Sequence, residues 1–139
     1  MNSDTIRRHL VGRRCNAVLV YEAHGPDGLI DGVAMLVLAL EAGGGRKEWV
    51  RVFFDVGGWS WTTTNEPVAP PEDPTGELHF PVTDIAPTLG LAGTEIRLAD
   101  LVPRGGDAGR FLLGFATGAM LSVEHDGDRT RLQVIPPAA

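Results

Sequence analysis

Alternating apolar and polar residues, the pattern of a β-strand with one buried face, recur along most of this chain. The pattern is clearest near the C-terminus, where residues 110–116, 119–125 and 129–135 are separated by short glycine-containing turns. Turns of this kind favour antiparallel hairpins, so the last third of the chain predicts a three-stranded meander. One face of this meander should be buried and the other solvated, with buried positions at Leu121, Val123, Leu132 and Val134.

Strand patterns also occupy the first two thirds of the chain. The run from Val33 to Leu40 is apolar throughout, which is typical of a central strand buried on both faces. The next strand, residues 48–56, should place Val50, Val52, Phe54 and Val56 on its core face. Further strands are predicted at residues 15–22, 59–63, 77–82 and 94–98, a helical turn at 84–89, and a short helix near the N-terminus, capped by Ser3 or Asp4.

The turn-forming residues are concentrated in a few places. The chain contains 18 glycines and 10 prolines, which favours many short elements over a few long helices. Residues 64–76 hold four prolines and three acidic residues and predict a long irregular loop with almost nothing to bury. We expect a mostly β protein of eight to nine short antiparallel strands, either a barrel or a two-sheet sandwich, with a short N-terminal helix.

The length of 139 residues corresponds to one β-rich domain, residues 1–139. The proline-rich acidic loop, residues 64–76, separates two stretches of equal length, 1–63 and 77–139. Leu10-Val11-Gly12 and Leu91-Ala92-Gly93 begin similar patterns, so two weakly related halves around one core are an alternative interpretation.

The charge pattern argues against nucleic acid as a partner. The net charge is −6, with eleven arginines and one lysine. Residues 1–63 carry seven basic and seven acidic groups, so the acidity belongs to the loop and to the C-terminal part. Binding to phosphates needs a basic face, which this distribution does not predict.

Several chemical classes are not indicated by the sequence. Cys15 is the only cysteine, and its apolar surroundings predict a buried thiol. No cofactor motif, metal-binding spacing, signal peptide or apolar stretch of membrane-spanning length is present, so we expect no cofactor, no metal, no membrane contact and a cytoplasmic location. We expect His125, beside an Asp-Gly turn, to be exposed, and His79 to lie at a solvent-facing or rim position.

The aromatic segment around residue 55 is the strongest candidate for a ligand site. All three tryptophans fall within thirteen residues, and alternation places Trp59 and Trp61 on one face of their strand. Large flat rings line small-molecule pockets and anchor interfaces, but they also fill wide β-cores. The candidate ligand-binding residues are Trp49, Trp59, Trp61, Tyr21, Phe53, Asp55 and Arg51.

Two functional hypotheses follow, and the sequence does not decide whether the protein is an enzyme. The first is a protein-binding module that docks a more basic partner through Glu66, Glu72 and Asp73; an immunity-type protein that neutralises a toxin would have these features. The second is a small-molecule-binding β-barrel, an isomerase or cyclase, whose cavity holds an apolar molecule. In that case Asp55, Glu22 or His79 would serve the reaction and residues 64–76 would form a lid over the barrel mouth. A homo-oligomer is a further alternative, with the run from Val33 to Leu40 at its interface.

Overall fold

The computed structural model describes residues 3–55, 58–103, 108–127 and 129–137. The elements are α1 (Ser3–Leu10), β1 (Arg14–Gly25), β2 (Gly28–Glu41), β3 (Lys47–Asp55), β4 (Gly58–Thr64), β5 (Val82–Asp84), α2 (Ala86–Leu89), β6 (Thr94–Pro103), β7 (Gly109–Phe115), β8 (Met120–Asp126) and β9 (Arg129–Ile135). Hydrogen bonds join the strands in the order β4-β3-β2-β1-β6-β7-β8-β9, and β5 pairs with β1. The predicted mostly antiparallel β fold with a short N-terminal helix is confirmed, but the sheet does not close into a barrel.

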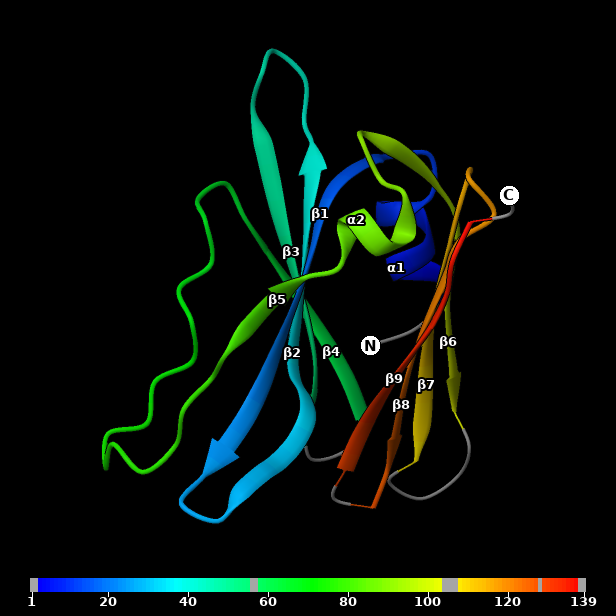
Figure 1. Ribbon diagram of the computed structural model, residues 1–139. Helices are drawn as coiled ribbons and strands as arrows, with labels where there is room; N and C mark the ends of the chain where they lie inside the picture. The colour runs from blue at the N-terminus through cyan, green and yellow to red at the C-terminus, as the bar shows by residue number, and fades with distance from the viewer. Residues whose placement is uncertain (1–2, 56–57, 104–107, 128, 138–139) are drawn as a thin grey trace.

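The path of strands folds over at β1, which changes partners along its length. One edge of β1 pairs with β2 from Cys15 to Gly25, whereas β6 pairs with the other edge only at Arg14 and Cys15. Further along, β5 takes this second edge at Leu19–Tyr21. Strands β1–β4 and β6–β9 therefore diverge from a short junction and form two layers that face each other (Figure 1).

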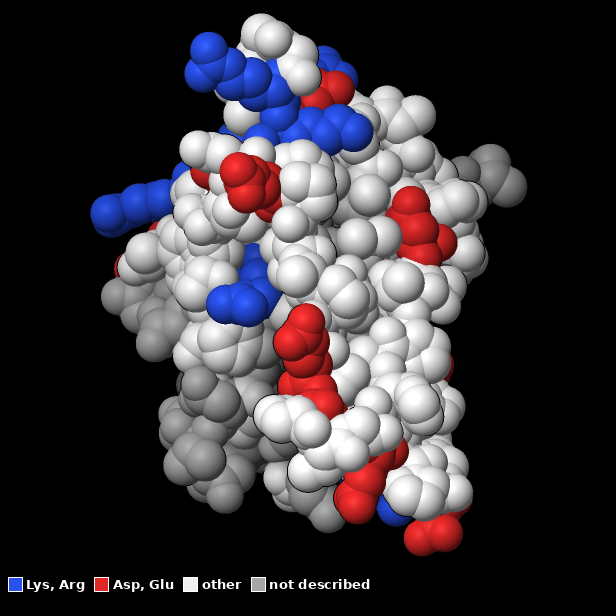
Figure 2. All heavy atoms as spheres, turned by 90° about the vertical axis from the view of Figure 1, so that its left-hand side faces the viewer, with Lys and Arg blue, Asp and Glu red and all other residues white. Residues whose placement is uncertain are grey.

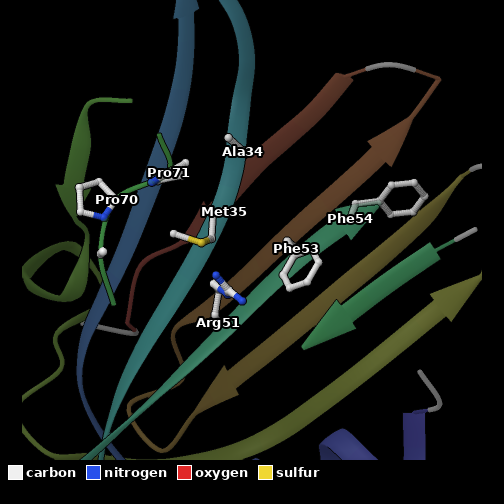
Figure 3. A pocket seen from close by; sticks show the side chains of 8 residues that line it. Ala34, Met35, Arg51, Phe53, Phe54, Pro70 and Pro71 are labelled. Carbon is white, nitrogen blue, oxygen red and sulfur yellow. The ribbon is translucent and has the colours of Figure 1, made fainter. Parts of the chain in front are cut away.

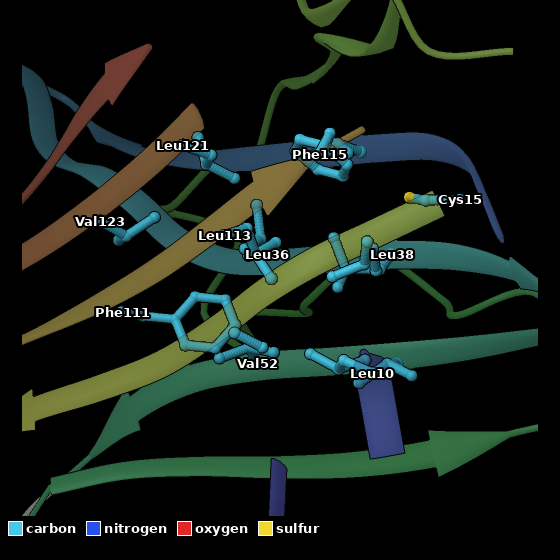
Figure 4. Packing of buried hydrophobic residues seen from close by; sticks show 14 of the residues in the cluster. Leu10, Cys15, Leu36, Leu38, Val52, Phe111, Leu113, Phe115, Leu121 and Val123 are labelled. Carbon is cyan, nitrogen blue, oxygen red and sulfur yellow. The ribbon is translucent and has the colours of Figure 1, made fainter. Parts of the chain in front are cut away.

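The hydrophobic core lies between these two layers. Phe111, Leu113 and Leu121 of the β6–β9 layer face Leu36 and Leu38 of β2, and all five are at most 1% exposed (Figure 4). Burying an aliphatic or aromatic side chain of this size stabilises a fold by about 1.5–3 kcal/mol. The core face predicted for β3 is confirmed at Val50 and Val52, which are fully buried in this cluster. Phe54 is half-buried, and Val56 lies outside the described residues.

Helix α1 fills one end of the space between the layers. Its buried residues, Ile6 and Leu10, are four positions apart and therefore share one helix face. Arg7 donates a hydrogen bond to Asp100 of β6 (3.3 Å), and His9 Nε2 lies 2.6 Å from Glu48 Oε1 of β3. The helix is thus bound to both layers, and Figure 1 shows it between them.

A buried polar group joins β2 to β9 at the other end. The Asp31 carboxylate accepts a hydrogen bond from the Thr130 N–H (2.8 Å), and the Thr130 hydroxyl lies 2.8 Å from His125 Nδ1. The second ring nitrogen of His125 is 3.0 Å from the Gly127 carbonyl oxygen, and Phe54 stacks on the ring with centroids 3.6 Å apart. The prediction that His125 is exposed is wrong: its side chain is the centre of this group and only 9% exposed.

The prediction of a strand at residues 77–82 is also wrong. Only Val82–Asp84 form a strand, and His79 contributes a single bridge to His24. Proline has no N–H to donate to a strand ladder, and Pro81 accordingly only accepts a hydrogen bond, from the Glu22 N–H (3.0 Å). The helical turn predicted nearby is present as α2, which ends at Gly90 in the left-handed conformation (φ 67°).

Candidate functional site

The outer face of the β1–β4 layer carries a second hydrophobic cluster, on strands β1–β3. Tyr21, Met35 and Val37 are at most 5% exposed, and Leu19 and Trp49 pack beside them. Residues 65–81, which connect β4 to β5 and are called here the covering segment, place Val68 and Phe80 on this cluster. The prediction of a long irregular loop at residues 64–76 is confirmed for most of that range, and so is the prediction that it buries almost nothing, because Val68 is its one residue partly buried on this cluster. Phe80, the larger of the two side chains, lies beyond the predicted loop.

A turn around Asp73 fixes the conformation of the covering segment. The Asp73 carboxylate accepts hydrogen bonds from the Thr75 hydroxyl (2.6 Å) and from the N–H groups of Thr75, Glu77 and Leu78 (3.0–3.1 Å). These bonds, chiefly those from Thr75, lower the pKa of Asp73 below its usual value. Asp73 therefore holds the segment together, while the two other acidic residues predicted for partner binding, Glu66 and Glu72, are exposed.

A hollow of about 480 Å³ opens between the covering segment and the outer side of β2 and β3. In Figure 3, Met35 and Arg51 lie between the prolines of the segment and the ring of Phe53, whereas Phe54 points away from them. The described lining of the hollow is mostly apolar and consists of Ala34, Met35, Arg51, Phe53, Phe54, Ala69, Pro70 and Pro71. Arg51 is the one ionisable residue among them.

Arg51 projects from the outer face of β3 toward this hollow. Its Nε donates a hydrogen bond to Thr62 Oγ1 of β4 (3.2 Å), and its guanidinium carbon lies 5.3 Å from the centre of the Phe53 ring. A second hollow of about 350 Å³ shares Arg51 and Ala69 with the first. Its other described lining residues are Thr62, Thr63, Thr64, Glu66, Pro67 and Val68.

The residues predicted for ligand binding are divided between the two faces of the layer. Tyr21, Trp49, Arg51 and Phe53 belong to the outer face. Trp59 and Trp61, which share a strand face as predicted, pack on the inner core instead. The Trp61 ring lies 4.9 Å from His9 of α1, and Trp59 contacts Phe54 edge-on at 5.4 Å.

The two tryptophans therefore have neighbours in the core, and the structure does not bring them together with Trp49. The indole Nε1 of Trp59 is buried and has no hydrogen-bond partner. The side chain of Asp55 lies outside the described part of the chain, although its backbone pairs with Gly58 at the end of β3.

The remaining candidates lie apart from the hollow. Glu22 pairs with His24 (3.3 Å), and His79 is exposed, in agreement with the rim position expected for it. Cys15 is buried as predicted, and burial raises the pKa of its thiol to about 12. Among the described residues, no three His, Cys, Asp or Glu side chains are placed to hold a metal ion together.

Figure 2 shows the face that carries the covering segment. Basic side chains gather at the end of this face that bears the β2–β3 hairpin, and another basic side chain lies in the middle of the face. Acidic side chains are spread over the rest of the face. The face therefore has basic side chains at one end and in its middle and acidic side chains over much of the remainder.

Sequence reasoning missed the part of the site that depends on the covering segment. Met35, Pro70 and Pro71 were not candidates, because neither apolar alternation nor a proline cluster indicates which surface a loop covers. One signal was present: β2 is apolar at both sets of alternating positions, so its outer face needs a cover.

Comparisons of the chain with models of protein families, with curated proteins and with solved structures give no match. Within the part of the chain that the structure describes, neither helix is long and apolar enough to cross a membrane.

Proposed function

We propose that this protein is a protein-binding module that docks a more basic partner on the outer face of β2, β3 and the covering segment. The observation that carries the proposal is the open, mostly apolar hollow of about 480 Å³. Exposed acids adjoin it: Glu72 follows the lining residue Pro71 in the chain, and Glu66 lines the smaller hollow that shares Arg51. An apolar centre with a charged periphery is the usual anatomy of a protein interface.

The covering segment supports this proposal because it is held in one conformation. Val68 and Phe80 anchor it to the sheet, and the Asp73 turn fixes its tip. A surface that is already ordered loses less conformational entropy when a partner binds. The exposed carboxylates would speed the encounter with a positively charged partner, as in a protein that neutralises a toxin.

The lining of the hollow favours binding over catalysis. General acid–base chemistry needs a group that exchanges a proton near the working pH. Among the described lining residues only Arg51 is ionisable, and a guanidinium stays protonated. An isomerase or cyclase reaction in this hollow therefore has no acid or base among those residues.

A comparative capture experiment tests the proposal. The tagged protein and its Glu72→Lys, Phe53→Ser and Asp126→Lys variants would be used to capture proteins from the cells that produce it, at low and high salt. We expect Glu72→Lys and Phe53→Ser to reduce the amount of a captured protein at least fivefold. Asp126→Lys should retain it, because this variant reverses an exposed acid at the end of β8 that lines neither hollow. Equal capture by all four proteins would refute the proposal.

A small amphipathic molecule is the second candidate occupant, favoured by the combination of Arg51 and Phe53 in the hollow. Native mass spectrometry of the protein isolated from its source cells distinguishes the two. A retained mass of a few hundred daltons that is lost in Phe53→Ser would favour the small molecule, whereas a retained polypeptide would favour docking.

A further inference from the structure

The two hollows on the outer face of β3 differ in chemistry and meet at Arg51. The larger one is formed by Met35, Phe53, Pro70 and Pro71 and is mostly apolar. The smaller one is lined by the hydroxyl-bearing residues 62–64 and by Glu66. A ligand that spans both would place an apolar group on one side of Arg51 and a hydrogen-bonding group on the other.

Within the described part of the chain, the charge of Arg51 is only partly satisfied. Its Nε–H has an acceptor, the Thr62 hydroxyl, and its guanidinium lies near the Phe53 ring. Among the described side chains, no carboxylate lies within ion-pairing distance of its guanidinium. A guanidinium presents a planar fork of donors that matches a carboxylate, so the remaining donors suit a carboxylate of the ligand.

We propose that this groove receives the C-terminal residue of a partner polypeptide, with its carboxylate on Arg51 and its apolar side chain in the larger hollow. This inference rests on the proposed docking function and names the chemical group that the partner inserts. The amide of the same residue then lies toward the smaller hollow, where threonine hydroxyls both donate and accept hydrogen bonds.

A chain terminus fits this arrangement better than an internal acidic side chain. In a C-terminal residue, the carboxylate, the side chain and the amide nitrogen are bonded to one carbon, which matches three neighbouring environments around Arg51. An internal Asp or Glu carries no second apolar group at that carbon. Glu66, which lines the smaller hollow, also disfavours a ligand with a second negative charge there.

The smallest probe of this proposal is N-acetyl-L-phenylalanine, which holds a terminal carboxylate, an aromatic side chain and one amide. Its matched control is N-acetyl-L-phenylalaninamide, in which a neutral carboxamide of the same shape replaces the carboxylate. Titration of the ¹⁵N-labelled protein, followed by NMR, should give a dissociation constant on the order of 1 mM for the acid, as expected for a fragment of this size. The amide should bind about tenfold more weakly.

Variants assign the effect to Arg51. Arg51→Gln should weaken binding of the acid about tenfold and remove the difference between acid and amide, while Arg131→Gln, an exposed position on β9, should change neither. Because the comparison of acid with amide uses the unaltered protein, it remains decisive even where a variant fails to fold.

Three results would overturn the inference: no shift with the acid up to about 20 mM, equal binding of acid and amide, or equal binding of 4-phenylbutyrate. The last would show that only a carboxylate and a ring are recognised, as in a site for a free small molecule. Failure of the capture experiment with Glu72→Lys is a separate result, because the titration requires no partner.

Discussion

The outer faces of the two layers differ in how far the rest of the chain covers them. On the β1–β3 layer, Met35 and Val37 are at most 5% exposed beneath the covering segment. On the β7–β9 layer, Leu112, Ser122 and Gln133 lie in one row across the three strands and remain half-buried or exposed. The first layer is therefore covered over part of its outer face, whereas the outer face of the second is solvated.

The difference shows where a binding surface can form in this fold. The solvated face needs no cover because polar residues alternate with apolar ones along its strands. The apolar outer face needs the covering segment, and the margin between that segment and the sheet leaves the hollow beside Arg51. The candidate site is therefore a consequence of covering an apolar sheet with an irregular chain.

The largest expected effect is on stability, when a charge is placed on each of the two outer faces in turn. Val37→Asp places a charge in the fully buried outer cluster and should lower the free energy of unfolding by at least about 3 kcal/mol, or prevent folding. Ser122→Asp on the solvated face should change it by no more than about 0.5 kcal/mol. Urea unfolding followed by circular dichroism measures both, and similar losses for the two variants would contradict the distinction.

A smaller effect is expected when the covering segment is loosened. Phe80→Ala removes a half-buried ring from the outer cluster and should lower the free energy of unfolding by about 2 kcal/mol. This is less than the loss expected for a fully buried phenylalanine. Limited proteolysis should then cut within residues 65–81 much faster than in the unaltered protein. Ile135→Ser, at a half-exposed position on the solvated face, is the control and should leave the cleavage rate unchanged.

The smallest effect concerns the acidic turn and depends on pH. Hydrogen bonds lower the pKa of Asp73, so its ionised form favours the folded segment. This contribution is present above the ordinary Asp pKa of about 3.9 and is lost as the pH falls through the lower value of the folded state. Asp73→Ala should accelerate proteolytic cleavage of the covering segment at pH 6. Hydrogen exchange of the same segment should differ between the variant and the unaltered protein at pH 6, and this difference should shrink toward pH 2.5. A difference that is independent of pH would exclude the carboxylate as its cause.

The sequence was sufficient for the elements whose pattern is local. Strand β9 matches its predicted bounds, and β7 and β8 differ from theirs by one residue at each end, because two-residue alternation and Gly turns define a meander without long-range contacts. The burial of Val50 and Val52 followed from the same rule.

The sequence was insufficient where distant segments meet. Nothing near His125 indicates that Asp31, Thr130 and Phe54 will surround it, so a position beside a turn predicted exposure. Likewise, alternation placed Trp59 and Trp61 on one face of a strand but did not show that the core lies against that face while Trp49 lies on the other. The candidate site has the same limitation, since its wall comes from a loop whose position only tertiary packing determines.

The contact of Asp31 with Thr130 has a consequence for how the chain folds. It joins residues 99 positions apart, and the β1–β6 junction likewise pairs Arg14 with Glu95. Contacts between such distant residues require a large loss of chain entropy before they become favourable, which slows folding to the range of about milliseconds to seconds. During synthesis, the first four strands must wait for β9 before this contact forms. Until then the apolar inner faces of the two layers stay partly open, so the newly made chain is most prone to aggregation before β9 has been synthesised.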